Sequence, residues 1–348
     1  MTRVWDVPVR DATRVRDARL AAEGAAALAG LDAERTQDAV LVATELTTNL
    51  LKHAHGGRLL VEAVAPAVPH EDATAVVQIA AVDHGPGMPD VAAALRDGFS
   101  TAGSLGAGLG TCRRLADDFD VHSADGRGTV ALARVGATHR PAGPPPAARA
   151  GGINLPLAGA EWSGDAWTCV RAGDRLTLLL ADGLGHGPEA ARASGAAVGE
   201  VRRWADLPPA EVLRRLHDAL RGTRGAAVAV AQLDLRQGEL RFAGVGNVGA
   251  RLREGGTWRS LVSRPGIVGA HRPATIPESR APWSADRLLI LYTDGLPSRW
   301  TPPDDPRLGT ADPAVTAAVA VRDAGSSARP MRDDTAVAVL APTPPERR

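Results

Sequence analysis

The sequence has little of several residue types, and two of these shortages exclude a class of protein. Only 3% of the residues are aromatic, and Lys52 is the only lysine. The two cysteines, Cys112 and Cys169, lie far apart without a C-x-x-C neighbour, which argues against a disulfide framework or a zinc site. No stretch approaches the roughly 18 apolar residues of a membrane-spanning helix, and the N-terminus has no apolar signal segment. We therefore expect a cytoplasmic protein.

The charges and the length indicate a protein of two domains. The chain has 40 basic and 40 acidic residues, which predicts neither a nucleic-acid partner nor a membrane surface. Its 348 residues are more than a single hydrophobic core usually accommodates. Residues 137–152 are dense in Pro, Ala and Gly without apolar periodicity, which is typical of a semi-rigid linker. We predict domains at 1–136 and 153–341, followed by a tail at 342–348.

Hydrophobic periodicity predicts mixed α and β structure in both halves. The first half should contain helices at 11–29, 33–54 and 109–118, strands at 59–65 and 75–82, and a hairpin around Asp125–Gly128. The second half should be richer in strands and more antiparallel. Its strands are expected at 166–171, 175–181, 226–235, 239–244, 248–253, 287–293 and 335–340, with helices near 187–204, 209–221 and 312–322.

One helix of the first half carries polar side chains on a single face. Glu45 and Asn49 are four residues apart, and His53 follows one turn later. A carboxylate, an amide and a basic group stacked in this way could hold a metal–phosphate assembly. The alternative interpretation is an ordinary solvated face.

Two glycine-rich segments follow. Asp83 ends a buried strand and precedes Gly85 and Gly87, so its carboxylate could accept a hydrogen bond from an adenine amino group. A plain turn would give the same pattern. The segment 103–110 leads directly into a helix, whose free N–H groups can bind phosphate. Its spacing fits neither a Rossmann fingerprint nor a Walker loop.

In this order, the motifs resemble those of the GHKL ATPase family. ELTTNLLKHA is similar to the N box, DHGPG and SLGAGLG to the glycine boxes, and GRGT to the last element. The run from FSTAG to GRGT is most similar to the RsbT/RsbW serine kinases, which phosphorylate anti-anti-sigma (STAS-domain) proteins. The resemblance implies ATP with Mg²⁺, bound by residues of these boxes. They are Asn49 for Mg²⁺, Glu45 as the base, Asp83 and Thr129 at adenine, Lys52 or His53 near phosphate, and the glycines Gly85, Gly87, Gly106, Gly108 and Gly110.

The second half places acidic residues at the ends of strands. Asp165 precedes one strand, Asp182 and Asp294 each end another, and Asp333 with Asp334 opens the last. Carboxylates that converge at one edge of a β-core repel one another and favour a hard divalent cation. An all-oxygen set favours Mg²⁺ or Mn²⁺, and a pair of such ions can activate water for attack on a phosphoryl group. The alternative interpretation is a set of Asp-Gly turns.

These residues resemble the metal-dependent protein phosphatase (PPM) family, in its SpoIIE-type branch. The blocks ADGLGHGPEAA, AGVGNVGARL, RPGIVG, LYTDG and RDDTAV stand in family order, and DGLGHGPEA is most similar to RsbX. The resemblance implies two Mn²⁺ or Mg²⁺ ions. Their ligands would be Asp165, Asp182, Gly183, Asp294 and Asp333, with Asp182 as the catalytic residue and Asp334 or Asp333 in a supporting position. His186 is a turn residue in the simpler interpretation.

Together the two resemblances predict an α+β protein, a GHKL α/β sandwich followed by an antiparallel PPM β-sandwich flanked by helices. The predicted function is a switch that phosphorylates and dephosphorylates a STAS-type partner in sigma-factor or stress signalling. A second hypothesis makes the N-terminal domain a non-catalytic module that senses nucleotide or binds a sigma factor. A third makes the phosphatase a degenerate scaffold, which the intact set of acidic residues argues against.

Overall fold

The computed structural model describes residues 3–70, 73–95, 108–137, 147–157, 160–325 and 331–344. The chain divides into two compact units. One comprises Val4–Pro66 and Thr74–Gly143, and the other comprises Met1–Arg3, Ala67–Ala73 and Pro144–Arg348. None of the helices in the described ranges has the length and apolar character needed to cross a membrane.

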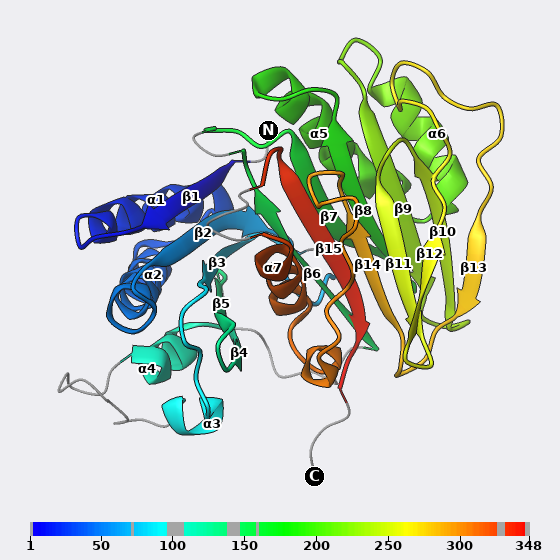
Figure 1. Ribbon diagram of the computed structural model, residues 1–348. Coiled ribbons are helices and arrows are strands. Elements are labelled where there is room, and N and C mark those ends of the chain that lie inside the picture. Colours follow the sequence, from blue (N-terminus) through cyan, green and yellow to red (C-terminus); the bar gives the residue numbers. More distant parts are fainter. Residues whose placement is uncertain are drawn as a thin grey trace. The chain divides into compact units, whose positions relative to one another are not determined.

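The first unit is an antiparallel sheet of five strands in the order β1-β2-β3-β5-β4. Its strands are β1 (Val4–Val9), β2 (Gly57–Val64), β3 (Val76–Val82), β4 (Asp118–Ala124) and β5 (Gly128–Val135). Its helices are α1 (Arg14–Ala29), α2 (Ala33–Ala54), α3 (Val91–Ala94) and α4 (Gly108–Leu115). As Figure 1 shows, α1 and α2 lie side by side on one face of the sheet, where their apolar side chains form a common core with it.

Small side chains and well-formed helix ends explain why α1 and α2 pack closely. The buried face of α1 consists of alanines, so the two helices can approach each other. Gly30 ends α1 in the left-handed region (φ 70°), and the Asp32 side chain caps α2 by accepting the N–H of Arg35. These ends orient α2, which carries the predicted N-box residues.

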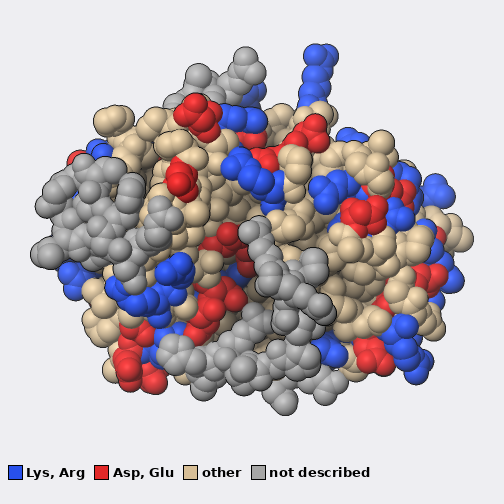
Figure 2. Space-filling view, turned by 90° about the horizontal axis from the view of Figure 1, so that it is seen from below, with Lys and Arg blue, Asp and Glu red and all other residues tan. Residues whose placement is uncertain are grey.

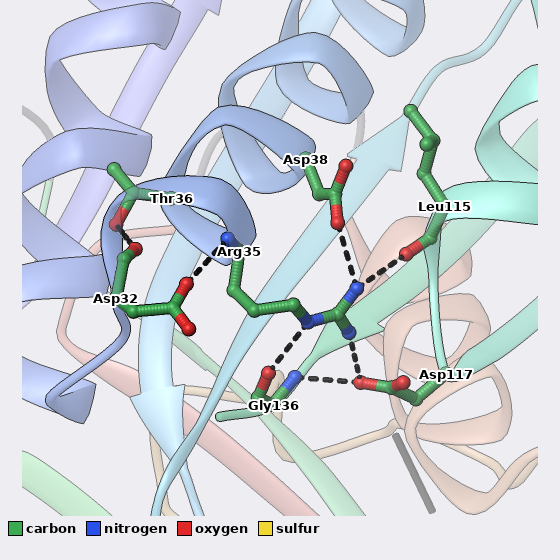
Figure 3. A network of polar contacts seen from close by, with 7 residues as sticks. All are labelled: Asp32, Arg35, Thr36, Asp38, Leu115, Asp117 and Gly136. Atoms are coloured by element: carbon green, nitrogen blue, oxygen red, sulfur yellow. Dashed lines mark hydrogen bonds and ion pairs between the residues drawn. The ribbon is translucent and has the colours of Figure 1, made fainter. Parts of the chain in front are cut away.

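A buried arginine ties three elements of this unit together (Figure 3). Arg35 donates to the carbonyl of Gly136, which follows β5, and to the carbonyl of Leu115 at the end of α4. Its guanidinium also pairs with Asp38 at 2.7 Å and with Asp117 at 2.6 Å. The start of α2 is thereby fixed to the end of α4 and to the exit of the sheet.

The second unit contains two stacked five-stranded antiparallel sheets, ordered β13-β10-β9-β8-β7 and β12-β11-β14-β15-β6. Their strands are β6 (Ala148–Leu155), β7 (Asp165–Ala172), β8 (Arg175–Gly183), β9 (Ala226–Asp234), β10 (Glu239–Val245), β11 (Gly249–Glu254), β12 (Thr257–Leu261), β13 (Ser279–Pro282), β14 (Leu288–Tyr292) and β15 (Thr335–Pro342). Figure 1 shows α5 (Pro188–Glu200) and α6 (Pro209–Ala219) on the outside of the first sheet. Helix α7 (Pro313–Ala324) packs on β6 and β15 of the other. The architecture expected from the sequence is confirmed: the first unit is an α/β sandwich, and the second is an antiparallel β-sandwich flanked by helices.

The structure corrects the predicted linker. Residues 138–146 lie outside the described residues, but Ala148–Gly152 belong to β6, which pairs with β15 along its whole length. Glycine is required at position 152 because an added Cβ would lie 2.7 Å from the Trp167 ring. Strand β15 likewise extends to Pro342, one residue into the predicted tail. The sequence prediction missed β1, β12 and β13.

Charged residues are intermixed on the surface. On the face in Figure 2, basic and acidic side chains alternate among the described residues, as the formal net charge of zero suggests. Many pairs lie one helical turn apart, such as Arg203 with Glu200 and Arg214 with Glu211. Such exposed pairs contribute little stability, and their arrangement does not mark a single-sign binding surface.

Candidate functional site

Helix α2 brings its N-box residues to the start of α4. Glu45 and Asn49 are half-buried on α2. A Cβ added to Gly108, the first residue of α4, would lie 3.5 Å from the Asn49 Oδ1 atom. Burial, with the charge of Glu45, raises the pKa of the Cys112 thiol in α4 to about 12. The predicted Mg²⁺ ligand and base are therefore both close to α4.

Asp83 directly follows β3 and is fixed there by contacts with its own loop and with the start of the neighbouring strand β5. It is 7% exposed, and its Oδ1 atom accepts the N–H of Gly85 at 2.8 Å and that of Thr129 at 3.1 Å. Gly87 and Gly128 have positive φ angles of 77° and 87°, and an added Cβ at either would lie within 2.3 Å of a backbone carbonyl. Thr129 also shares a 2.9 Å hydrogen bond with Ser123. The predicted first glycine box and the GRGT segment therefore form one bonded cluster.

The remaining predicted residues of this site are placed differently. Lys52 and His53 are exposed in the last turn of α2, and neither forms an ion pair with the described residues. Gly110 is buried in α4. Gly106 lies outside the described residues.

The acidic residues of the second unit come together because the strand ends that carry them meet. In the antiparallel pair β7–β8, Asp165 lies directly opposite Asp182. Asp294 follows β14, and Asp333 and Asp334 precede β15, its neighbour in the second sheet. A pocket of about 530 Å³ opens here, and Asp182, Asp294 and Asp333 are the carboxylates in its lining.

The electrostatics of this cluster are unfavourable without a counter-charge. Burial and the charges of Asp294, Asp333 and Asp334 raise the pKa of Asp182 from 3.8 to about 7. Burial and the charge of Asp182 raise the pKa of Asp165 well above its ordinary value, although the Thr293 hydroxyl opposes this. Carboxylates that resist ionisation in this way gain from a cation.

Hydrogen bonds from the surrounding backbone and side chains hold Asp165 and Asp334 in place. Asp165 is 1% exposed, and its Oδ2 atom accepts a 2.7 Å hydrogen bond from the Thr293 hydroxyl. Asp334 accepts the N–H of Leu157 with one oxygen and the N–H of Gly164 with the other. Asp333 lines the pocket, whereas Asp334 is absent from the lining. The geometry thus distinguishes the two neighbouring aspartates that the sequence left open.

Gly183 has no room for a side chain. A Cβ there would lie 2.1 Å from the carbonyl oxygen of Ala190, and its own N–H bonds to the carbonyl of Gly164. His186 is exposed in the following loop and is not part of the pocket lining. The simpler interpretation of this histidine, as a turn residue, agrees with its position.

The carboxylates of the pocket suit a divalent cation that keeps part of its water shell. In the described part of the chain, no three His, Cys, Asp or Glu side chains are gathered tightly enough to hold one ion as they stand. Mg²⁺ is usually bound in proteins by one or two carboxylates and completes its coordination with water. The three pocket carboxylates, of which Asp182 has a raised pKa, and the close-packed backbone of Gly183 fit such an ion.

The sequence prediction missed two residues that support this pocket. Asn247, in the GVGN block, donates its amide N–H to the Asp294 Oδ2 atom at 2.5 Å and lines the pocket. Thr293 bonds to Asp165 and also accepts the N–H of Ala336 from the adjacent strand. Asn247 stands in a block that the sequence analysis marked, but its partner is 47 residues away.

Comparison with known proteins assigns both units. Residues 8–134 match the histidine kinase-like ATPase domain, and residues 172–342 match SpoIIE, the stage II sporulation protein E family. RsbT of Bacillus subtilis (strain 168), a serine/threonine-protein kinase, is 41% identical over 86 residues, which are 25% of this chain and 61% of RsbT. RsbX of the same organism, a phosphoserine phosphatase, is 26% identical over 135 residues, which are 38% of this chain and 67% of RsbX.

Solved structures are also similar to the chain. One is described as "The bacterial stressosome: a modular system that has been adapted to control secondary messenger signaling". It is 29% identical with a TM-score of 0.49, and the match covers 56% of this chain and 98% of that one. A crystal structure of RsbX in complex with magnesium is 22% identical with a TM-score of 0.47, and the match covers 56% of this chain and 96% of that one. The chain joins an N-terminal histidine kinase-like ATPase domain, similar to RsbT, to a C-terminal SpoIIE-type PP2C phosphatase domain, similar to RsbX.

Proposed function

We propose that the C-terminal domain hydrolyses phosphoserine or phosphothreonine esters of a protein. The observation that carries this proposal is the meeting of Asp182, Asp294 and Asp333 around one pocket, where their repulsion calls for cations. These three carboxylates and the carbonyl of Gly183 would hold two Mn²⁺ or Mg²⁺ ions. When bound, such ions neutralise the phosphoryl group and lower the pKa of water.

The chain's own residues hold this arrangement in place. Asn247 orients the Asp294 carboxylate through its amide. Asp165 would act through Asp182, which it faces across the β7–β8 pair, because it is 1% exposed and does not line the pocket. Asp334 fixes the segments that contain Leu157 and Gly164. We assign Asp165 and Asp334 as positioning residues.

The N-terminal domain is proposed to phosphorylate the same partner with ATP and Mg²⁺. Asn49 would hold Mg²⁺ beside the start of α4, Glu45 would act as base for the accepting hydroxyl, and Asp83 would bind adenine. The proximity of Asn49 to Gly108 supports this placement. The alternative is a non-catalytic module that senses nucleotide or binds a sigma factor. Glu45→Ala separates the two: in the kinase case it removes phosphotransfer and leaves partner binding intact, whereas a non-catalytic module has no phosphotransfer to lose.

The proposed partner is a STAS-type (anti-anti-sigma) protein in sigma-factor or stress signalling. Similarity to both RsbT and RsbX, a protein kinase and a phosphoserine phosphatase, supports one partner that is phosphorylated and dephosphorylated. A purified STAS protein, phosphorylated by the chain in ATP and dephosphorylated in Mn²⁺ without nucleotide, would bear out both activities.

The decisive experiment is phosphate release from p-nitrophenyl phosphate by the full chain in Mn²⁺ or in EDTA. Turnover should require Mn²⁺ and should fall by at least 100-fold in Asp182→Asn. Asp174→Asn is the matched control, because Asp174 is exposed in the turn at the opposite end of the β7–β8 hairpin. Turnover that persists in EDTA or survives Asp182→Asn would contradict the proposal.

A further inference from the structure

Among the residues that the structure describes, the lining of the phosphatase pocket contains no positive side chain. Twelve residues line it, three of them carboxylates and none of them Lys, Arg or His. A phosphomonoester carries about −1.5 to −2 charges at neutral pH, so carboxylates alone would repel it. Recognition of the phosphate by the protein therefore requires basic side chains at the rim of the pocket.

Arg224 reaches this rim. Its Nη1 atom lies 3.2 Å from the position that a Cβ would take at Gly185, and Gly185 lines the pocket. Gly185 has a φ of 86°, a conformation that favours glycine, so the loop and the guanidinium lie close together without a side chain between them. Arg224 precedes Ala226, the first residue of β9, and Ala227 of that strand also lines the pocket.

The Arg224 guanidinium has no ion-pair or hydrogen-bond partner among the described residues, whereas the nearby Arg221 and Arg192 do. Arg221 pairs with Asp218 at 3.2 Å, and Arg192 lies 3.8 Å from Glu189 and donates to the carbonyl of Gly222. Among the described residues, the Arg224 side chain makes no ion pair or hydrogen bond. An exposed arginine without a partner retains all its donors for a ligand.

The backbone on both sides of Arg224 is fixed. The Thr223 hydroxyl donates to the carbonyl of Leu220 and accepts the N–H of Gly225, which defines the turn after α6. The Gly225 carbonyl accepts the N–H of Leu184, which lines the pocket. Ala226 pairs with Val268, which follows the lining residue Ile267. A side chain that starts from a fixed backbone loses less entropy when it binds.

We propose that Arg224 is a substrate-binding residue, whose guanidinium donates hydrogen bonds to the phosphate oxygens of the phosphoserine or phosphothreonine ester at the mouth of the pocket. The planar guanidinium matches two phosphate oxygens at once, which an ammonium group does not. This inference rests on the proposed phosphatase function and names a recognition residue for it.

The test compares Arg224→Ala, Arg224→Lys and Arg221→Ala in the full chain. With p-nitrophenyl phosphate and Mn²⁺, Arg224→Ala should lower kcat/KM by roughly 10- to 100-fold, the loss expected for one hydrogen bond between charged groups. Most of the loss should appear in KM. Arg224→Lys should recover part of the lost kcat/KM. Arg221→Ala should match the wild type because the Arg221 side chain pairs with Asp218.

A second readout is independent of turnover. Calorimetric titration of the Mn²⁺-loaded chain with inorganic phosphate should show binding weakened about 10-fold or more in Arg224→Ala and unchanged in Arg221→Ala. Equal phosphate affinity in Arg224→Ala and the wild type would overturn the assignment. If the wild type shows no Mn²⁺-dependent turnover, the proposed function fails, while the phosphate titration still decides the role of Arg224.

Discussion

Asp333 and Asp334 are adjacent in sequence but have different surroundings. Asp333 lines the pocket, whereas Asp334 is 4% exposed and accepts two backbone N–H groups from Leu157 and Gly164. Two structural hydrogen bonds to one carboxylate indicate a role in holding the loop before β7. Substitution of Asp333 should therefore affect activity, whereas substitution of Asp334 should affect stability.

We predict that Asp333→Asn abolishes Mn²⁺-dependent phosphatase activity with little change in stability. Asp334→Asn should instead lower the free energy of unfolding by about 1–3 kcal/mol, because its amide leaves one buried N–H without an acceptor. Urea unfolding and phosphatase assays on both variants check this. The assignment would be reversed if Asp333→Asn unfolded more easily and Asp334→Asn lost only activity.

The raised pKa of Asp182 predicts a pH-dependent stability in the absence of metal. Its pKa is about 7 in the folded chain against an ordinary 3.8, so folding favours the neutral carboxyl. That contribution is complete below pH 3.8 and is lost as the pH rises through about 7. In EDTA, the urea midpoint should therefore fall from pH 5 to pH 8, and the fall should be smaller in Asp182→Asn than in Asp174→Asn.

Much of this site could be predicted from the sequence, because strand ends are visible in the pattern of apolar runs. The convergence of Asp182, Asp294 and Asp333 follows from three Asp residues at three strand ends. The hydrogen bond that Asp165 accepts from Thr293 could not be predicted, since the two residues are 128 positions apart. Contacts at such separation depend on the stacking of two sheets, which local patterns do not encode.

Helix α2 shows how one buried side chain can fix an element in its domain. Arg35 has a side chain only 6% exposed and joins α2 to the end of α4 and to Gly136 (Figure 3). We predict that Arg35→Ala destabilises the N-terminal domain by about 3–5 kcal/mol, because Asp38 and Asp117 lose their partner in a buried site. Hydrogen exchange of the α2 amides provides the measurement.

The control for Arg35 is Arg14→Ala on the neighbouring helix. Arg14 pairs with Asp17 at 2.8 Å, but both side chains are more than 40% exposed. An exposed pair of this kind contributes about 0–1 kcal/mol. Equal protection of α2 in the two variants would show that the Arg35 network does not stabilise the helix.

The sequence prediction missed elements that tertiary contacts stabilise although their own amino-acid composition does not indicate a strand. The sequence predicts a linker up to residue 152, which includes Ala148, Ala150 and two glycines of strand β6, yet this strand is buried against β15 and Trp167. β12 and β13 are short edge strands with exposed residues, so their apolar signal is weak. Long amphipathic elements such as α2 were predicted with the bounds they have, Ala33–Ala54.

In the whole chain, the two proposed activities oppose each other. A kinase and a phosphatase that act on one partner at the same time would only hydrolyse ATP. Their fusion is useful if nucleotide binding selects between them, which requires that nucleotide have different affinities for two states of the chain. Only the intact chain can couple the two activities in this way, because separated domains share no conformational equilibrium.

We predict that ATP changes the Mn²⁺-dependent phosphatase rate of the intact chain by roughly 5- to 150-fold, the range of typical coupling free energies. Asp83→Ala should remove this response but leave the nucleotide-free rate unchanged, because Asp83 lies in the ATPase domain and is bonded to Gly85 and Thr129 there. The rate is measured with p-nitrophenyl phosphate, which bypasses the kinase. Identical rates with ATP, with ADP and without nucleotide would mean that the fusion only brings two independent enzymes to the same partner.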